Sequence, residues 1–188
     1  MEAAPVNIIQ YFDGSKQGVI PLFQRPYSWE QKDWAALWED LMAQYETDDK
    51  SSHFMGAVVT MPVKSVPVGV IKHLVIDGQQ RLTTLSLLLA AIRDKAIAEM
   101  ENSTAGIIGD LLINRHYNAP DDLKLVPTQA DRSAYNAVVY QKKLEPHEES
   151  RVIQAYRFFQ KNSMAEILRN SLLVHQKCSK RYSSHCRL

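Results

Sequence analysis

Two short polar segments contain the side chains of this sequence that are best suited to binding or chemistry. One is DGQQR, residues 77–81, which follows the apolar run 73–76. The other is QRPYSW, residues 24–29, which also joins a predicted strand to a predicted helix. Turns of this kind present polar side chains and unpaired backbone N–H groups at the protein surface, where ligands bind.

The turn at residues 77–81 has the features of an anion site. Gly78 permits a positive φ and a close backbone approach. The first N–H groups of the following helix have no partner within the helix and together carry about half a positive charge, so they suit a phosphate. Arg81 in the first helical turn opposes the helix dipole, which makes sense if an anion is bound. Asp77 can accept from an arginine, hold a divalent cation or orient a water.

The second segment adds a guanidinium and aromatic rings. Arg25 can bind a phosphate through two N–H groups, and Tyr27 or Trp29 can stack on a base. A purely structural interpretation stays open for both segments. In that interpretation Asp77 caps the helix and pairs with Arg25, while Tyr27 and Trp29 are core aromatics, with Trp29 better suited to the core than to a ligand.

Composition limits the classes of function. The chain has 188 residues, 45% hydrophobic and 23% charged, with a formal net charge of +1. These values are typical of a soluble globular protein without a global field for nucleic acid or membrane. No secretory signal is present, the apolar stretch 87–92 is too short to span a bilayer, and the cysteines are confined to the tail. We therefore expect no membrane association, no disulfide scaffold and a cytoplasmic location.

The hydrophobic pattern predicts an α+β fold, with a small mixed sheet first and mainly helix afterwards. Ser28 or its neighbour would cap a helix, with Gln31 completing a capping pair with Ser28, and Trp34 and Tyr45 would lie on the inner face of that helix. The runs 54–61 and 73–76 lack alternation, which predicts strands covered on both faces. The other predicted strands are 19–22 and 123–126. The other predicted helices are 5–12, 80–100, 107–113, one that Thr128 caps with Tyr135, Val138 and Val139 inward, and 148–173 with Val152, Tyr156, Phe159, Ile167 and Leu168 packing inward.

Three blocks of the sequence carry a family resemblance. IPLFQRPYSWEQKDWAALWEDL, HFMGAVV and VIDGQQRLTTLSLLLAAIRD follow one another between residues 20 and 94. They resemble the N-terminal domain of GmrSD-type restriction endonucleases, the DGQQR-box family (domain of unknown function 262), which is related in fold to ParB and sulfiredoxin proteins. The resemblance implies a ParB-like nucleotide-binding core at residues 1–102 and a helical extension at 103–174.

The resemblance also implies a function. It suggests an antiphage defence module that binds and hydrolyses a nucleoside triphosphate with Mg²⁺, coupled to cleavage of modified DNA. The expected catalytic residues are Asp77, Arg81 and Arg25, with Asp77 the candidate Mg²⁺ ligand. The expected phosphate- or nucleotide-binding residues are Gln24, Arg25, Tyr27, Gly78, Gln79, Gln80, Arg81, Thr83 and Thr84. The alternatives are a DNA-binding module that senses modification without catalysis, and an inactive fragment that covers an exposed apolar face by self-association.

The chain departs from the family after the helical extension. Relatives often continue into a His-Asn-His nuclease domain, whereas here His116 and Asn118 lack a second histidine and are expected at the surface, so a nuclease would be a separate or missing partner. The basic tail, residues 175–188, is expected to be a truncated or out-of-frame end. Its His175, Cys178, His185 and Cys186 lack the paired spacing of zinc sites, so we expect no structural metal.

Overall fold

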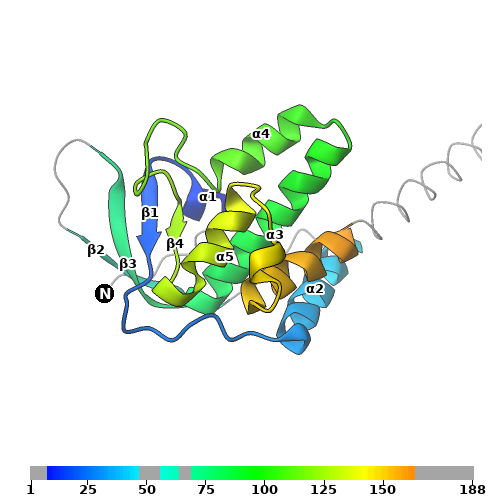
Figure 1. The fold of residues 1–188 in the computed structure, drawn as a ribbon, viewed down its shortest axis with the longest axis horizontal. Coiled ribbons are helices and arrows are strands. Elements are labelled where there is room, and N and C mark those ends of the chain that lie inside the picture. The colour runs from blue at the N-terminus through cyan, green and yellow to red at the C-terminus, as the bar shows by residue number, and fades with distance from the viewer. Residues whose placement is uncertain (1–7, 47–55, 64–68, 164–188) are drawn as a thin grey trace, which may run out of the picture.

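The computed structural model describes residues 8–46, 56–63 and 69–163 of the chain. It confirms the α+β class: a four-stranded mixed sheet lies on one side and most of the helices lie on the other (Figure 1). The elements are α1 (Ile8–Phe12), β1 (Lys16–Val19), α2 (Gln31–Glu46), β2 (Val59–Pro62), β3 (Ile71–Asp77), α3 (Gln79–Ala98), α4 (Asn102–Asp110), β4 (Leu125–Val126), α5 (Gln129–Val139), the 3₁₀ helix η1 (Glu145–His147) and a helix over 151–163.

The strand order is β2-β3-β1-β4. The central strand β1 runs parallel to both neighbours, with Gly18 in register with His73 on β3 and with Leu125 on β4. Strand β2 pairs antiparallel to β3 at one edge. Because β4 belongs to the sheet, the predicted extension 103–174 contributes a strand to the core; the boundary at residue 102 stays a prediction.

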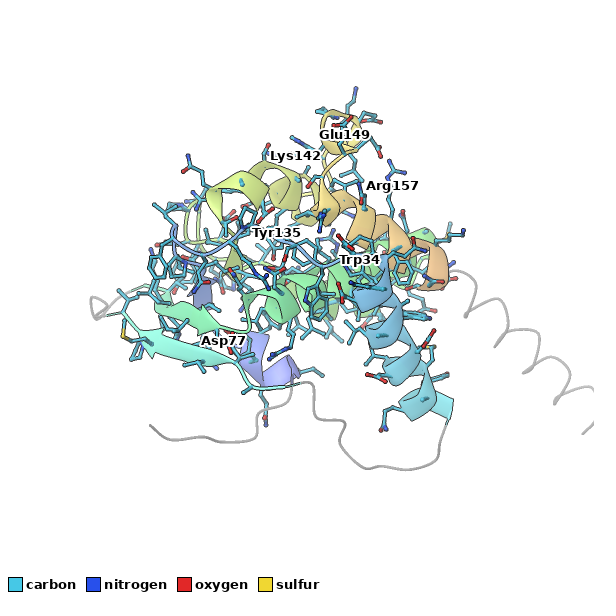
Figure 2. The ribbon with its side chains drawn as sticks, turned by 90° about the horizontal axis from the view of Figure 1, so that it is seen from below. Trp34, Asp77, Tyr135, Lys142, Glu149 and Arg157 are labelled. Atoms are coloured by element: carbon cyan, nitrogen blue, oxygen red, sulfur yellow. The ribbon has the colours of Figure 1, made fainter. Side chains whose placement is uncertain are left out.

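Helix α3 is the centre of the core. Thirteen of its 20 residues are buried, and it packs against α4, α5 and the sheet. The core joins Val75 of β3, Leu87 of α3, Tyr135 of α5 and Phe159 of the last helix, each less than 1% exposed. Figure 2 shows the end of the last helix beside α2, and there the rings of Trp34 and Phe158 lie 5.9 Å apart between centroids.

The strand predictions need correction. The described strands of the runs 54–61 and 73–76 are not covered on both faces: in β2 no residue is buried, and in β3 only Val75 is, while residues 54–55 lie outside the described ranges. For β2 the reason is its edge position, because an edge strand buries less side-chain surface than a central strand. The first strand spans 16–19 rather than 19–22, since its register with β3 begins at Lys16, and Pro21, which has no N–H group, lies beyond the ladder.

Helix ends differ from the predictions more than helix positions do. The Ser28–Gln31 capping pair is wrong: α2 begins at Gln31, and Asp33 Oδ2 accepts from Glu30 N–H at 2.9 Å. Tyr45 is 67% exposed because the end of α2 extends past the core.

The remaining helix predictions agree more closely. The helix expected at 107–113 is α4, at Asn102–Asp110. Helix α3, the Thr128 start of α5 and the inward residues Tyr135, Val138, Val139, Val152, Tyr156 and Phe159 are confirmed. Ile167, Leu168 and the tail lie outside the described residues.

In the described ranges, every helix is too short or too polar to cross a bilayer.

The junction between β3 and α3 requires glycine. Gly78 has φ 88°, and a Cβ there would lie 2.9 Å from Val58 Cγ2. The sequence predicts that Gly78 allows a close backbone approach. The residues that approach it are Ala57 and Val58, which precede β2 and pass beside the turn.

We predict that Gly78→Ala lowers the free energy of unfolding by roughly 1–3 kcal/mol, since alanine is strained at this φ and meets Val58. Urea unfolding measures the change. Gly106→Ala is the control, because Gly106 lies within α4 and its added Cβ would approach nothing closer than 3.8 Å; it should raise stability by about 0.5–1 kcal/mol. Equal stability of Gly78→Ala and wild type would contradict this view of the junction.

Candidate functional site

The two predicted polar segments lie side by side, joined by three side-chain amides. Gln80 Oε1 accepts from Ser28 N–H at 2.8 Å, and its Nε2 donates to Pro26 O at 3.2 Å. Gln24 Nε2 donates to Ile76 O at 3.0 Å, and Gln79 Nε2 donates to Gln24 Oε1 at 3.2 Å. The amide of Gln80 is thus bonded on both sides by the backbone of the 24–29 segment, and the amides of Gln24 and Gln79 fix that segment to the end of β3.

Tyr27 is an anchor of this arrangement, buried to 5% exposure. Its hydroxyl accepts from Trp34 Nε1 at 2.8 Å and lies 2.7 Å from Thr84 Oγ1, which donates to Gln80 O at 2.8 Å. The phenol therefore donates to Thr84. Burial raises the pKa of Tyr27 above its ordinary value, which keeps this donor protonated. The hydroxyls of Tyr27 and Thr84 are bonded within the fold, and Thr83 is also buried.

Residues of α5 and of the helix over 151–163 also bind the segment 24–29. Asp131 of α5 accepts from Tyr27 N–H at 2.8 Å and from Thr128 Oγ1 at 2.6 Å. Arg151 of the last helix donates to Ser28 O at 2.6 Å and pairs with Glu30 at 3.1 Å. Sequence reasoning missed both residues, because a helix-start aspartate and a surface arginine give no local sign of a partner more than a hundred residues away.

Two of the predicted catalytic groups are exposed and unpaired. In the described ranges, neither Arg25 nor Asp77 forms an ion pair or a hydrogen bond through its side chain. Asp77 ends β3 beside the start of α3 (Figure 2), yet it does not cap that helix, whose N-cap is Gly78 without a side-chain acceptor. The Arg25–Asp77 pair of the structural interpretation is therefore not formed.

Arg81 is half-buried and has a backbone partner. Its Nη1 donates to Ala57 O, and a Cβ at Gly56 would lie 2.8 Å from its Cζ. The guanidinium thus lies along the backbone at 56–57, which accounts for a cation in the first turn of a helix without requiring an anion. A guanidinium has five N–H donors, so one bond to a carbonyl leaves others for a ligand.

The aromatic residue best exposed near the site is one that the sequence analysis passed over. Phe23 is 82% exposed and Leu22 is 73% exposed, directly before Gln24. Trp29 is only partly buried but packs against the core, as expected. The local signal was present: Pro21 ends the pairing of β1, which places the next two apolar residues outside the sheet.

Two hollows in the surface lie outside the two polar segments. One of about 410 Å³ lies between α3, α4 and the end of α5, and one of about 220 Å³ lies beside α1; neither is lined by residues of the two polar segments. Of the residues of the candidate site, Arg25 and Asp77 are exposed, whereas Gln79 and Gln80 are buried. Within the part of the chain that the structure describes, no three His, Cys, Asp or Glu side chains group as metal ligands; the tail with its histidines and cysteines lies outside it.

The whole-chain comparison agrees with the resemblance of the three sequence blocks. Residues 8–184 match the model of the GmrSD restriction endonuclease N-terminal domain. The chain therefore belongs to this family and is a module of a restriction system. A comparison with curated proteins finds no match.

The bonds of Gln80 lead to a stability prediction with a defined pH dependence. In Gln80→Glu an ionised carboxylate faces Pro26 O, which only a donor can satisfy. We expect a loss of roughly 1–3 kcal/mol in the free energy of unfolding near neutral pH. The unfavourable contact raises the pKa of the new carboxyl in the folded state, so the loss should shrink as pH falls and the protonated form donates to Pro26 O.

Urea unfolding across a pH series measures this effect. Gln31→Glu is the matched control, because Gln31 is exposed in the first turn of α2, where an acid is neutral or slightly favourable. A Gln80→Glu loss that is absent, or that does not depend on pH, would show that the two bonds are not required.

Proposed function

We propose that this GmrSD N-terminal domain binds the phosphate groups of a nucleoside triphosphate at the start of α3, and hydrolyses it with Mg²⁺ as part of a modification-dependent restriction system. One observation carries the proposal: Arg25 and Asp77 are exposed and have no side-chain partner among the described residues, and Asp77 directly precedes the N-cap of the 20-residue helix α3, which has no side-chain cap. Charged side chains held at one surface without partners serve a ligand more readily than they serve stability.

The phosphate groups would be bound by backbone and side chains together. The first N–H groups of α3 and its dipole favour an anion. Arg25 adds a guanidinium. The residues on either side of Arg25 are fixed, Gln24 by the hydrogen bond of its amide to Ile76 O and Pro26 by the bond from Gln80. Arg81 adds the N–H groups that Ala57 does not use. Gln24, Gln79 and Gln80 act in this scheme mainly by positioning, since their amides are bonded within the site.

Hydrolysis would depend on Asp77. Phosphoryl transfer needs charge neutralisation and a positioned water more than covalent chemistry. Asp77 is the carboxylate of the turn, and Mg²⁺ is typically bound by one or two carboxylates together with substrate phosphates, while it keeps several waters. In this proposal Mg²⁺ brings neutralisation of the phosphate charge, and Asp77 holds the ion or orients the attacking water.

We predict that ATP, GTP, CTP or UTP with Mg²⁺ raises the thermal stability of the chain, and that Arg25→Ala and Arg81→Ala remove the shift. A ligand that binds only the folded state adds about 2.7 kcal/mol at a hundredfold excess over Kd. Asp77→Ala should abolish phosphate release. Arg157→Ala is the control, because Arg157 is a half-exposed arginine of the last helix that pairs with Glu148. If all four triphosphates leave the transition of the wild type unmoved, the nucleotide site is excluded.

Phe23 tests how the base is held. Phe23→Ala should weaken the binding of a nucleoside triphosphate by roughly fivefold to a hundredfold, since base–aromatic stacking contributes roughly 1–3 kcal/mol. It should leave the affinity for inorganic tripolyphosphate unchanged. Calorimetric titration of both ligands separates the two effects. Equal losses for both ligands would mean that Phe23 supports the phosphate site rather than the base.

A second candidate function is DNA sensing without catalysis, and the exposure of Arg25, Phe23 and Leu22 favours it. An exposed surface with Phe23, Leu22 and Arg25 fits a duplex backbone or an unstacked modified base as well as it fits a nucleotide. This function predicts a gel shift with modified over plain duplex that Arg25→Ala weakens, and no phosphate release from any nucleotide. Cleavage of DNA would then require a separate nuclease partner.

A further inference from the structure

We propose that the chain has a second anion site, which binds a phosphate group in the hollow beside α1. The hollow has a volume of about 220 Å³ and is lined by Tyr11, Lys16, Gln17, Thr60, His73 and Lys124 among others. This inference does not rest on the proposed function.

The lysines of the hollow lie far from the turn at residues 77–81. Lys16 begins β1 and is in register with Ile71, the first residue of β3, whereas Asp77 is the last residue of that strand, roughly 20 Å along it. The other end of the hollow comes nearer, because Thr60 pairs with Val75, two residues before Asp77. A ligand bound at the lysines and a ligand at the start of α3 would still occupy different places, and each can be removed by mutation without touching the other.

Two lysines meet in this hollow without a carboxylate partner. Lys124 is 7% exposed and its Nζ donates to Gly14 O, while Lys16 Cε would lie 3.9 Å from a Cβ at Gly14 and its Nζ donates to Gln10 O at 3.3 Å. In the described ranges neither lysine forms an ion pair. A buried ammonium without a counterion is costly, because charges removed from water are normally paired.

Two acids lie near Lys124 without forming an ion pair with it in the described ranges. Burial is the main cause that lowers the pKa of Lys124; Asp13 and Asp110 act against it, and the weaker repulsion of Lys16 acts with it. Asp13 Oδ1 accepts from Gly14 N–H at 2.8 Å, and Asp110 pairs with Arg115. Both carboxylates thus have other partners as well. An anion in the hollow would mainly relieve the cost of burying the Lys124 ammonium.

Neutral donors complete the site. The Tyr11 hydroxyl lies 3.5 Å from the Cβ position of Gly18 and bonds to no other described residue. Burial raises the pKa of Tyr11 to about 12, so the hydroxyl stays protonated and able to donate. The imidazole of His73 and the hydroxyl of Thr60 also line the hollow. Gln17 Nε2 is bonded to Pro120 O and Leu123 O, both at 2.8 Å, and supports the wall instead.

The charge of the two lysines and the volume of the hollow indicate which ligands can bind there. Lysines bind phosphate as point charges, and two of them with hydroxyl and imidazole donors suit a tetrahedral dianion. Ligand pockets for larger molecules are roughly 300–1,000 Å³, so this hollow admits a phosphate group and little beyond it. That group can come from a free phosphate compound or from the backbone of DNA.

The test is titration of the full chain with inorganic phosphate, followed through the backbone amide signals of Gly14 and Gly18 by NMR. We expect those signals to shift, and we expect Lys16→Met to weaken the affinity about tenfold or more, because it removes a charged donor from the site. Lys16 is exposed, so this variant should fold. Lys124→Met should abolish the shift if it folds.

Two controls and a second ligand complete the design. Lys32→Met, which removes an exposed lysine of α2, and Arg81→Ala at the other site should bind phosphate in the hollow as the wild type does. A short DNA duplex that shifts the same signals and competes with phosphate identifies DNA as the source; a duplex without effect identifies a free phosphate compound. The proposal is overturned if phosphate leaves Gly14 and Gly18 unmoved, or if Lys16→Met binds as tightly as Lys32→Met.

Discussion

The buried amide of Gln80 is the interaction on which the rest of the site depends. Its oxygen and its nitrogen are both used, by Ser28 N–H at 2.8 Å and Pro26 O at 3.2 Å. A residue of the central helix is thereby joined to a loop fifty residues earlier in the sequence. Because a buried amide that loses either partner costs free energy, the loop has one favourable position. Arg25 precedes Pro26, and so its position follows from that of the loop.

The remaining bonds of the loop show how helices and sheet cooperate at this surface. Tyr27 reaches into the core and meets Trp34 of α2 and Thr84 of α3 through its hydroxyl. Its N–H group is taken by Asp131 of α5, which belongs to the later, helical part of the chain. The helical part therefore supplies partners that hold the loop before α2 in place.

Much of the fold follows from local pattern. The long apolar stripe predicts α3 almost to its ends, the Thr128 start predicts α5, and the strand–glycine–helix order of residues 73–81 predicts the junction at Gly78. The predictions fail where contacts with other parts of the chain determine the burial of a strand or the start of a helix. The apolar runs of β2 and β3 indicated strands covered on both faces, yet an edge position leaves β2 exposed. Helix α2 begins at Gln31 and not after Ser28: Ser28 N–H is already bonded to Gln80, and the Asp33 carboxylate accepts from Glu30 N–H instead.

The sequence alone determined the types of residue at the site and the turns that carry them, because helix periodicity, glycine and proline act over a few residues. It also determined the family, since the three blocks that resemble the GmrSD N-terminal domain lie within a chain that matches it over residues 8–184. Only the tertiary structure decided which polar groups are bonded within the protein and which face outward. Tyr27, Thr84 and Gln80 are bonded within the fold, while Arg25, Asp77 and Phe23 are exposed. The physical reason is that a side chain's partners come from distant parts of the chain, and no local pattern records them.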